Sequence, residues 1–338
     1  MTGGAISAAG GDRRRAMLRT AMGPAIGLAL ADPRVLEIMV NPDGALRLDV
    51  LGQGRVDTEI KLDPAQVERI VRLVASHARA EVHGDAPIVS AELPPSIDGC
   101  AGERFEGVLP PVSTGPCFSI RKPAQRLYTL DDYIADGIVS PAAADRLRDA
   151  VRRRFNILVA GGTSSGKTTL ANALLAEMAS ADERVILIED TRELQSPAAD
   201  TVALRTRPAS ANMTGGVSMA DLVRSTLRLR PDRIIVGEVR GPEALDMLKA
   251  WNTGHPGGIA TVHANSALRA LYRIEQLVQE AVVTVPRELI AAAIDLVVFI
   301  SGRGLDRRVS IIARVDGLDA RGGYALVDLV NPASPQGD

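Results

Sequence analysis

The chain has 338 residues and a formal net charge of −2, with 46% hydrophobic and 24% charged residues. This length predicts about two domains of ordinary globular composition, and the near-neutral charge excludes a strong overall attraction to nucleic acid or acidic membranes. No stretch reaches the roughly 20 apolar residues of a membrane span, and the N-terminus resembles no secretory signal. Cys100 and Cys117 form no zinc-binding CxxC pair. We therefore expect a cytoplasmic protein.

The first part of the chain predicts a small α/β domain at residues 13–121, after a Gly- and Ala-rich tail at 1–12 that we expect to be disordered. A helix is predicted from about Leu18 to Met39, and a second helix begins with Asp63 as its cap and Pro64 in its first turn. Alternating apolar residues predict strands at 46–50, 56–62, 104–109 and 118–121. Residues 122–133 read as a linker.

Residues 134–330 show short apolar runs that alternate with helical patterns, which is typical of a parallel sheet covered by helices. The predicted strands are 157–160, 185–188, 234–236, 259–262 and 296–300, with a final hairpin at 309–315 and 324–330. Helix starts are indicated by a capping box at Ser218 and Asp221, by Gly241-Pro242, and by Ser266. The last residues, 331–338, form a tail.

The sequence GGTSSGKT at 161–168 matches the phosphate-binding loop pattern G-x-x-x-x-G-K-[ST], and it lies between an apolar strand and a helix. That order places backbone N–H groups and a helix N-terminus around an anion. We expect Lys167 to reach the β- and γ-phosphates of ATP and Thr168 to bind Mg²⁺. The predicted nucleotide-binding residues are Gly161, Gly162, Thr163, Ser164, Ser165, Gly166, Lys167, Thr168 and Thr169.

Carboxylates follow two of the predicted strands, where parallel strands open toward a ligand. Glu238 ends the run IIVGE, and we expect it to orient or deprotonate the attacking water. Glu189, Asp190 and Glu193 follow the strand at 185–188 and suggest help with Mg²⁺ or water, with Glu189 as the candidate metal ligand and Glu193 as a candidate catalytic residue. Each of these carboxylates has an alternative role as an ordinary cap or ion-pair partner, as Glu238 has beside Arg240.

A histidine closes a further glycine-flanked strand, GGIATVHA at 257–264. His263 would lie near the same edge of the sheet, where its imidazole could sense the γ-phosphate. A single histidine is more often structural, but its place at the end of a parallel strand favours a role in the site.

These four motifs occur in the order found in the type II/type IV secretion ATPases, which the chain resembles. The quoted stretches are GGTSSGKT (161–168), IEDTREL (188–194), PDRIIVGEVRG (231–241) and GGIATVHA (257–264). Within that superfamily, EALDMLKAWNTGHPGGIATVHANS (243–266) and NPDGALRLD (41–49) are most similar to the TrbB-type conjugal transfer ATPases. The resemblance covers nearly the whole chain apart from its two tails.

The resemblance implies a PAS-like N-terminal α/β domain followed by a RecA-like ATPase domain, and a homohexameric ring. It also implies peripheral association with the inner-membrane components of a secretion complex. Arginines of the first domain reach the terminal phosphate in this family, and the matching positions are Arg104 (in GERF) and Arg121 (in SIRKP). Such guanidinium groups stabilise charge in the transition state. The four-cysteine zinc module of many related export ATPases is absent, which favours the conjugation branch.

Three alternatives remain at this stage. A motor for pilus assembly or retraction, or for type II secretion, shares the same motifs. A nucleic-acid motor would also be ring-shaped, but the chain offers no obvious aromatic platform or basic track for direct nucleic-acid binding, since aromatic residues are only 3% of the sequence. A scaffold that binds ATP without turnover is the third.

Overall fold

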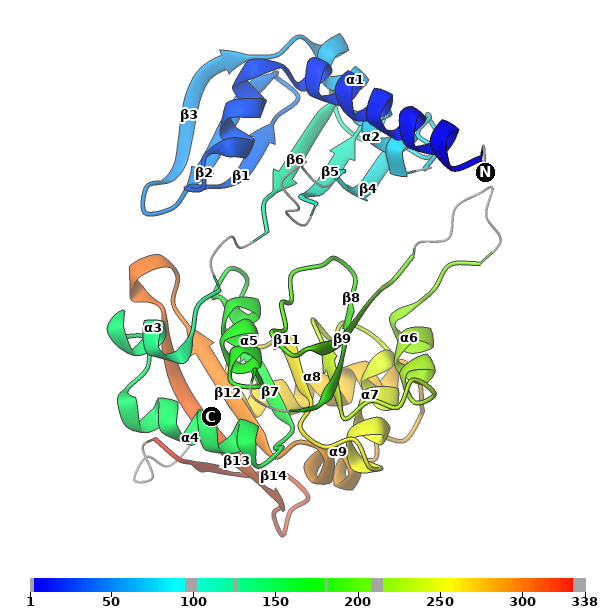
Figure 1. Ribbon diagram of the computed structural model, residues 1–338. Coiled ribbons are helices and arrows are strands. Elements are labelled where there is room, and N and C mark those ends of the chain that lie inside the picture. The colour runs from blue at the N-terminus through cyan, green and yellow to red at the C-terminus, as the bar shows by residue number, and fades with distance from the viewer. Residues whose placement is uncertain are drawn as a thin grey trace. The chain divides into compact units, whose positions relative to one another are not determined.

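The computed structural model describes residues 3–78, 80–94, 102–123, 127–179, 182–207 and 215–330. The chain divides into two compact units with a boundary between residues 125 and 126, and the second unit comprises most of the chain after it. Each unit combines helices with a sheet of its own (Figure 1). The predicted mixed α/β class is therefore confirmed.

The first unit is built on a six-stranded sheet in the order β3-β2-β1-β6-β5-β4, in which every pairing is antiparallel. Its elements are α1 (Gly3–Ala31), β1 (Val35–Val40), β2 (Ala45–Val50), β3 (Gly54–Lys61), α2 (Pro64–Ala78), β4 (Ile88–Glu92), β5 (Arg104–Val108) and β6 (Cys117–Arg121). The predicted strands and the helix that starts at Pro64 are confirmed.

The core of the first unit lies between its helices and one face of the sheet (Figure 1). On α2, Val67, Ile70, Val71 and Val74 recur at helical spacing and are at most 1% exposed. Alternate residues of β5 and β6 point into this core, as Phe105 and Ile120 do. The residues between them lie on the other face of the sheet, because successive side chains of a strand point to opposite sides.

The first helix ends earlier than the sequence predicts, so the expected helix from Leu18 to Met39 is wrong after Ala31. The helix α1 stops at Ala31, and residues 35–40 form the strand β1. Pro33 cannot continue the helical hydrogen bonds, and the run VLEIMV alternates buried with less buried positions as a half-buried strand does. At its other end α1 begins at Gly3, inside the segment that composition predicts to be disordered.

The second unit contains an eight-stranded sheet in the order β14-β13-β12-β7-β11-β10-β8-β9. Its helices are α3 (Leu130–Ala135), α4 (Pro141–Arg152), α5 (Lys167–Ala176), α6 (Met219–Thr226), α7 (Glu243–Asn252), α8 (Ala267–Gln279), α9 (Arg287–Ala293) and the short 3₁₀ helix η1 (Gly304–Asp306). Its strands are β7 (Ile157–Gly161), β8 (Arg184–Glu189), β9 (Asp200–Arg205), β10 (Arg233–Val236), β11 (Ile259–His263), β12 (Leu296–Ser301), β13 (Arg308–Leu318) and β14 (Tyr324–Asp328).

The strands from β12 through β7, β11, β10 and β8 to β9 pair in parallel, and β13 and β14 complete the sheet as an antiparallel hairpin. All five predicted apolar strands and the predicted C-terminal hairpin are confirmed, whereas β9 was not predicted. The capping box at Ser218 and the cap at Ser266 are present as expected. Within the described ranges, no helix combines the length and apolarity that crossing a membrane requires.

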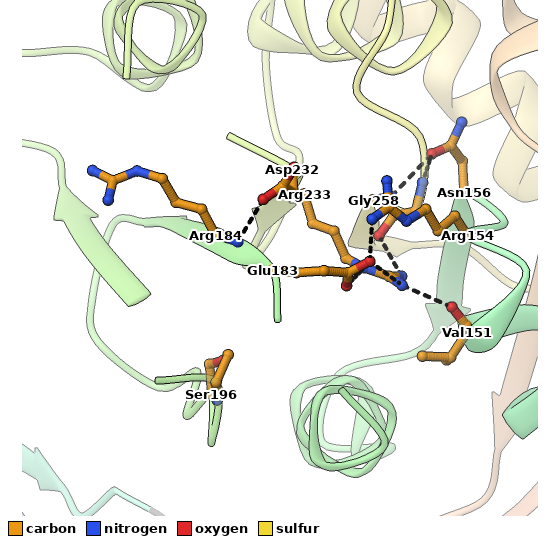
Figure 2. Close-up of polar contacts among 11 residues, drawn as sticks. Val151, Arg154, Asn156, Glu183, Arg184, Ser196, Asp232, Arg233 and Gly258 are labelled. Carbon is orange, nitrogen blue, oxygen red and sulfur yellow. Dashed lines mark hydrogen bonds and ion pairs between the residues drawn. The ribbon is translucent and has the colours of Figure 1, made fainter. Parts of the chain in front are cut away.

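A buried ion-pair network ties together the amino ends of β8 and β10 (Figure 2). Arg233 is 3% exposed and pairs with Glu183, and its Nη2 also donates to the carbonyl oxygen of Val151 at 3.0 Å. Arg154 Nη2 lies 2.6 Å from Glu183 Oε1. The Glu183 carboxylate therefore balances the charges of two guanidinium groups. The predicted site lies at the opposite ends of these strands.

Asn156 performs a similar function in front of β7. Its Oδ1 accepts hydrogen bonds from the backbone N–H groups of Gly257 and Gly258, both at 2.9 Å, and its Nδ2 donates to Ala293 at 2.8 Å. Asn156 is 5% exposed, so all of these bonds are shielded from water. The starts of β7 and β11 are thereby fixed to each other.

The Glu183 network generates a stability prediction. Glu183→Ala leaves Arg233 buried without its counter-ion, which costs on the order of 3–5 kcal/mol. Urea unfolding should therefore show a large fall in the free energy of unfolding. The matched control is Asp200→Ala, which removes the partner of the more exposed Arg184 and should cost much less. Equal losses in the two variants would contradict the assignment of the network as a buried one.

Candidate functional site

The phosphate-binding loop connects β7 to α5. The strand β7 is buried along its whole length, and the helix α5 starts at Lys167. Between them, Ser164 and Gly166 adopt positive φ values of 61° and 94°, and Ser165 Oγ donates to the carbonyl oxygen of Gly162 at 2.9 Å. Left-handed residues within a turn direct successive N–H groups toward one side, which forms an anion-binding concavity at the start of a helix.

Gly161 is required by a close approach of β12 to the start of the loop. A Cβ atom at this position would lie 2.5 Å from the carbonyl oxygen of Ile300 and 2.6 Å from Ser165 Oγ. Any side chain would therefore displace either β12 or the loop. Thr163 and Ser164 are exposed, while Thr168 and Thr169 are half-buried in the first turn of α5.

Lys167, His263 and Glu238 form a continuous chain of polar contacts, as the sequence predicts for three motifs that meet at one edge of the sheet. Lys167 is 7% exposed, and its Nζ lies 2.9 Å from the carbonyl oxygen of Gly162 and 3.3 Å from His263 Nδ1. His263 Nε2 lies 2.8 Å from Glu238 Oε1. The parallel pairing of β11 with β7 places the Cα of His263 opposite that of Gly161.

These contacts assign the protonation of His263. The ammonium group of Lys167 can only donate, so His263 Nδ1 accepts, and the proton of the neutral ring is then on Nε2, which lies 2.8 Å from Glu238 Oε1. This is the neutral form of the imidazole. Partial burial, followed by the nearby charge of Lys167, lowers the pKa of His263 below its ordinary value, in agreement with that form. His263 therefore connects the phosphate-binding lysine to the candidate catalytic carboxylate.

Glu238 is held from two sides after the end of β10. Thr261 Oγ1 donates to the carbonyl oxygen of Gly237 at 2.6 Å, and the N–H of Val239 donates to the carbonyl oxygen of Thr261 at 2.9 Å. Arg240 forms an ion pair with the second oxygen of the Glu238 carboxylate. This hydrogen bond, helped by the charges of Asp190 and Glu193, raises the pKa of Arg240, so the acidic cluster also lies within electrostatic reach.

The acidic segment after β8 is fastened from inside the unit. Glu189 is 3% exposed, and its Oε1 accepts hydrogen bonds from the N–H groups of Glu193 and Leu194 at 2.9 and 2.8 Å. Burial raises the pKa of Glu189 to about 7, although both backbone bonds oppose the shift. Asn172 on α5 donates to the carbonyl oxygen of Glu193 at 3.0 Å and accepts from the N–H of Gln195 at 2.9 Å.

This arrangement bears on the predicted Mg²⁺ ligands. Oε1 of Glu189 is committed to the backbone, so only its second oxygen would remain for a metal. Thr168 lies one residue after Lys167, at the start of α5, where a hydroxyl ligand is expected. In the described parts of the chain, no three His, Cys, Asp or Glu side chains gather to hold a metal ion. Mg²⁺ commonly keeps several waters and binds through few protein ligands plus phosphates, so these residues fit only that mode.

Arg104 and Arg121 belong to the first unit, where the structure brings them together. They are direct cross-strand partners in β5 and β6, on the face of the sheet opposite the core. Glu92 is the partner of Arg104 in β4, and Glu37 is the partner of Arg121 in β1. Neither guanidinium group forms a hydrogen bond or ion pair with any residue in the ranges given above.

Two residues that position the site were not found from the sequence. Asn172 lies within a helix whose pattern is otherwise apolar, and its partners are more than 20 residues away in the chain. Thr261 looks like an ordinary β-branched strand residue. No local signal distinguishes either residue, because each acts through contacts that only the folded chain creates.

The fold and the site define a phosphate-loop nucleotide-binding protein. The sequence profile of the family described as "Type II/IV secretion system protein" matches residues 54–303. The chain belongs to this family, which confirms the resemblance seen in its motifs.

Similar proteins support this membership. "Conjugal transfer protein TrbB" of Rhizobium radiobacter is 46% identical over 302 residues, covering 89% of this chain and 90% of the relative. "Type IV secretion system protein PtlH" of Bordetella pertussis is 35% identical over 320 residues, covering 85% and 92%. The solved structure of the pilus retraction motor PilT with bound ADP has a TM-score of 0.59 and 20% identity, covering 90% of this chain and 80% of that one, and supports the fold alone.

The two hydrogen bonds between Asn172 and the acidic segment, here called the clamp, yield a second prediction. Asn172→Ala removes a buried donor and a buried acceptor, which should cost about 1–3 kcal/mol of stability. Because the segment carries Glu193, we expect kcat for nucleotide hydrolysis to fall as well. Asn252→Ala, at the exposed end of α7, is the control and should change neither quantity. Unchanged stability in Asn172→Ala would show that the clamp contributes little.

Proposed function

We propose that the chain hydrolyses ATP as the motor of a conjugative type IV secretion system. The observation that carries this proposal is the chain of contacts from Lys167 through His263 to Glu238, because it joins a phosphate-binding cation to a carboxylate able to act on water. The conjugal transfer relative, which matches 89% of this chain, supports the biological role. Pilus assembly and type II secretion use the same motifs, but the similarity to the TrbB relatives favours conjugation.

The nucleotide would be held by the loop and by Lys167. The N–H groups of the turn and the N-terminus of α5 supply positive dipole ends, and Lys167 adds a full charge. Thr168 is the first candidate ligand of Mg²⁺, and the free oxygen of Glu189 is the second. When bound, Mg²⁺ would neutralise charge on the phosphate oxygens.

Glu238 would orient the attacking water or accept its proton. Arg240 pairs with one of its oxygens and His263 Nε2 lies 2.8 Å from the other, so both oxygens face a neighbouring group before substrate arrives. When a γ-phosphate draws the Lys167 ammonium group toward itself, His263 loses its hydrogen bond from lysine. The contact between the imidazole and Glu238 would then differ between the states with and without the γ-phosphate. Glu193, near Arg240, would assist from the acidic segment.

Arg104 and Arg121 would supply the positive charge for the terminal phosphate. Two arginines directly opposite each other on neighbouring strands repel, at a cost of about 0.2–1 kcal/mol. A shared anion would remove this repulsion. A guanidinium group from another domain would also couple domain closure to the state of the nucleotide.

The finer features of the assembly belong to the same proposal. We propose a PAS-like domain at residues 13–121, a linker at 122–133, and a RecA-like domain with a mostly parallel sheet at 134–330. The chain would act as a homohexamer at the cytoplasmic side of the inner membrane, in contact with membrane components of the secretion complex and without direct nucleic-acid binding. The similarity to a conjugal transfer protein and to a type IV secretion system protein supports the contact with a secretion complex.

Substitutions in the chain of contacts test hydrolysis. Glu238→Gln should keep nucleotide binding and lower kcat about 10²–10⁴-fold, the usual contribution of a general base. Lys167→Ala should weaken nucleotide binding as well as turnover. Phosphate release and nucleotide titration measure the two effects, with the exposed Glu288→Gln as the control. Wild-type turnover in Glu238→Gln would falsify the role of this carboxylate, and a wild type that binds ATP without turnover would support a scaffold.

The arginine pair has its own test. Arg121→Ala and Arg104→Ala should retain nucleotide binding and lose at least about tenfold in kcat, whereas Arg55→Ala on the exposed edge strand β3 should not. The stability of the first unit should change little in Arg121→Ala, because the substitution removes the like-charge neighbour of Arg104 and also the opposite-charge neighbour of Glu37. Full hydrolysis in both single variants and in the double variant would exclude the pair from the reaction.

A further inference from the structure

Arg307 lies against the phosphate-binding loop from the side opposite His263. A Cβ atom on Gly166 would be 2.9 Å from both Cζ and Nε of Arg307, and 3.2 Å from its Nη1. The guanidinium group is therefore in contact with the last glycine of the loop, which is also the N-cap of α5. None of the sequence motifs includes this arginine.

The fold delivers Arg307 to this position by a tight connection between β12 and β13. The strand β12 pairs with β7 up to the register of Ile300 with Gly161, so the connection starts beside the loop (Figure 1). Gly302 turns the chain with a φ of 76°. The N–H of Arg307 then donates to the carbonyl oxygen of Gly304 at 3.4 Å. The backbone at Arg307 is thus fixed by the turn rather than left to vary.

The side chain of Arg307 has a buried donor without an acceptor. Its Nε is shielded from solvent and has no hydrogen-bond partner among the described residues. The hydroxyl group of Tyr133 is buried nearby without a partner as well. Burial raises the pKa of Tyr133, and the charge of Arg307 opposes that shift.

A purely structural role does not account for this arrangement. A buried donor without an acceptor is costly, and a cation at a helix N-terminus is repelled by the helix dipole. Lys167 adds a second positive charge at the same end of α5. All three unfavourable features disappear when an anion occupies the loop, because it accepts the hydrogen bond and balances both charges.

The order of the strands indicates which part of a nucleotide Arg307 would contact. His263 and Glu238 follow β11 and β10, on one flank of β7, whereas Arg307 follows β12 on the other flank. The bond to be hydrolysed lies toward Glu238. Arg307 therefore faces the portion of the nucleotide that remains in the product.

We propose that Arg307 is a binding residue of the nucleotide site, and that its guanidinium group donates to the phosphates that ADP and ATP have in common. This proposal rests on the proposed nucleotide binding, but it does not require hydrolysis. It assigns the connection between β12 and β13 to the site, in addition to the four motifs. It also separates the residues that hold both nucleotides from those that act only on the terminal phosphate.

Calorimetric titration of the full chain with Mg²⁺-ADP and with a non-hydrolysable ATP analogue tests the proposal. Arg307→Met keeps the aliphatic packing against Gly166 and removes the donors, so we expect Kd to rise on the order of tenfold for both nucleotides, as for the loss of a charge-assisted hydrogen bond. Arg307→Lys should recover part of the affinity. Arg303→Ala, an exposed arginine of the same connection, is the control and should bind like the wild type. In steady-state hydrolysis the loss should fall on KM rather than on kcat.

Thermal unfolding without nucleotide separates binding from structure. The proposal expects no fall in the Tm of Arg307→Met and a smaller rise in Tm on addition of ADP. A folded Arg307→Met with wild-type Kd for ADP would overturn it, and so would a loss confined to kcat. If the wild type binds ADP but hydrolyses no ATP, the proposed activity fails while the ADP titrations still decide the role of Arg307. If the wild type binds neither nucleotide, both proposals fail.

Discussion

The parallel pairing of β11 with β7 is the constraint on which the site depends. Its register sets His263 opposite Gly161, so the imidazole stands between the lysine of the loop and the carboxylate after β10. A shift by one residue would turn the histidine to the other face of the sheet. The two strands are fixed at their starts by Asn156, whose side chain binds the backbone in front of β11. The positions of the candidate site residues thus depend in part on contacts at the opposite end of the same strands.

The sequence predicts those features whose cause is local. Apolar runs of three to five residues indicate the buried strands, and Ser218 and Ser266 indicate helix starts through the chemistry of their own side chains. The strand β1 was missed because helical and strand periods are hard to separate in a short apolar run, and Pro33 was not taken as the end of the helix. The strand β9 at the edge of the sheet was missed because its residues are only half-buried or exposed and include no strongly apolar run.

The site was predictable to the same extent. Lys167, Glu238 and His263 come from motifs at strand ends, and their meeting follows from the rule that parallel strands open toward a ligand at their carboxyl ends. Asn172 and Arg307 contact partners far away in the chain, and neither side chain has an unusual neighbour in the sequence. The sequence indicates that Glu189 lies at the end of a strand, but its burial and its two backbone hydrogen bonds follow only from the packing of the acidic segment against Gly237.

The network around Glu183 lies at the amino ends of β8 and β10, and the carboxylates proposed to take part in the reaction lie at their carboxyl ends. The ion pairs that stabilise the fold and the carboxylates proposed to react therefore lie at opposite ends of the same strands. Loss of the Glu183 ion pairs reduces the population of folded chains, and this population varies steeply with temperature. Substitutions in this network are therefore candidates for temperature-sensitive variants. Such variants would be active at low temperature and inactive at higher temperature, so they could stop the protein at a chosen time inside a living cell.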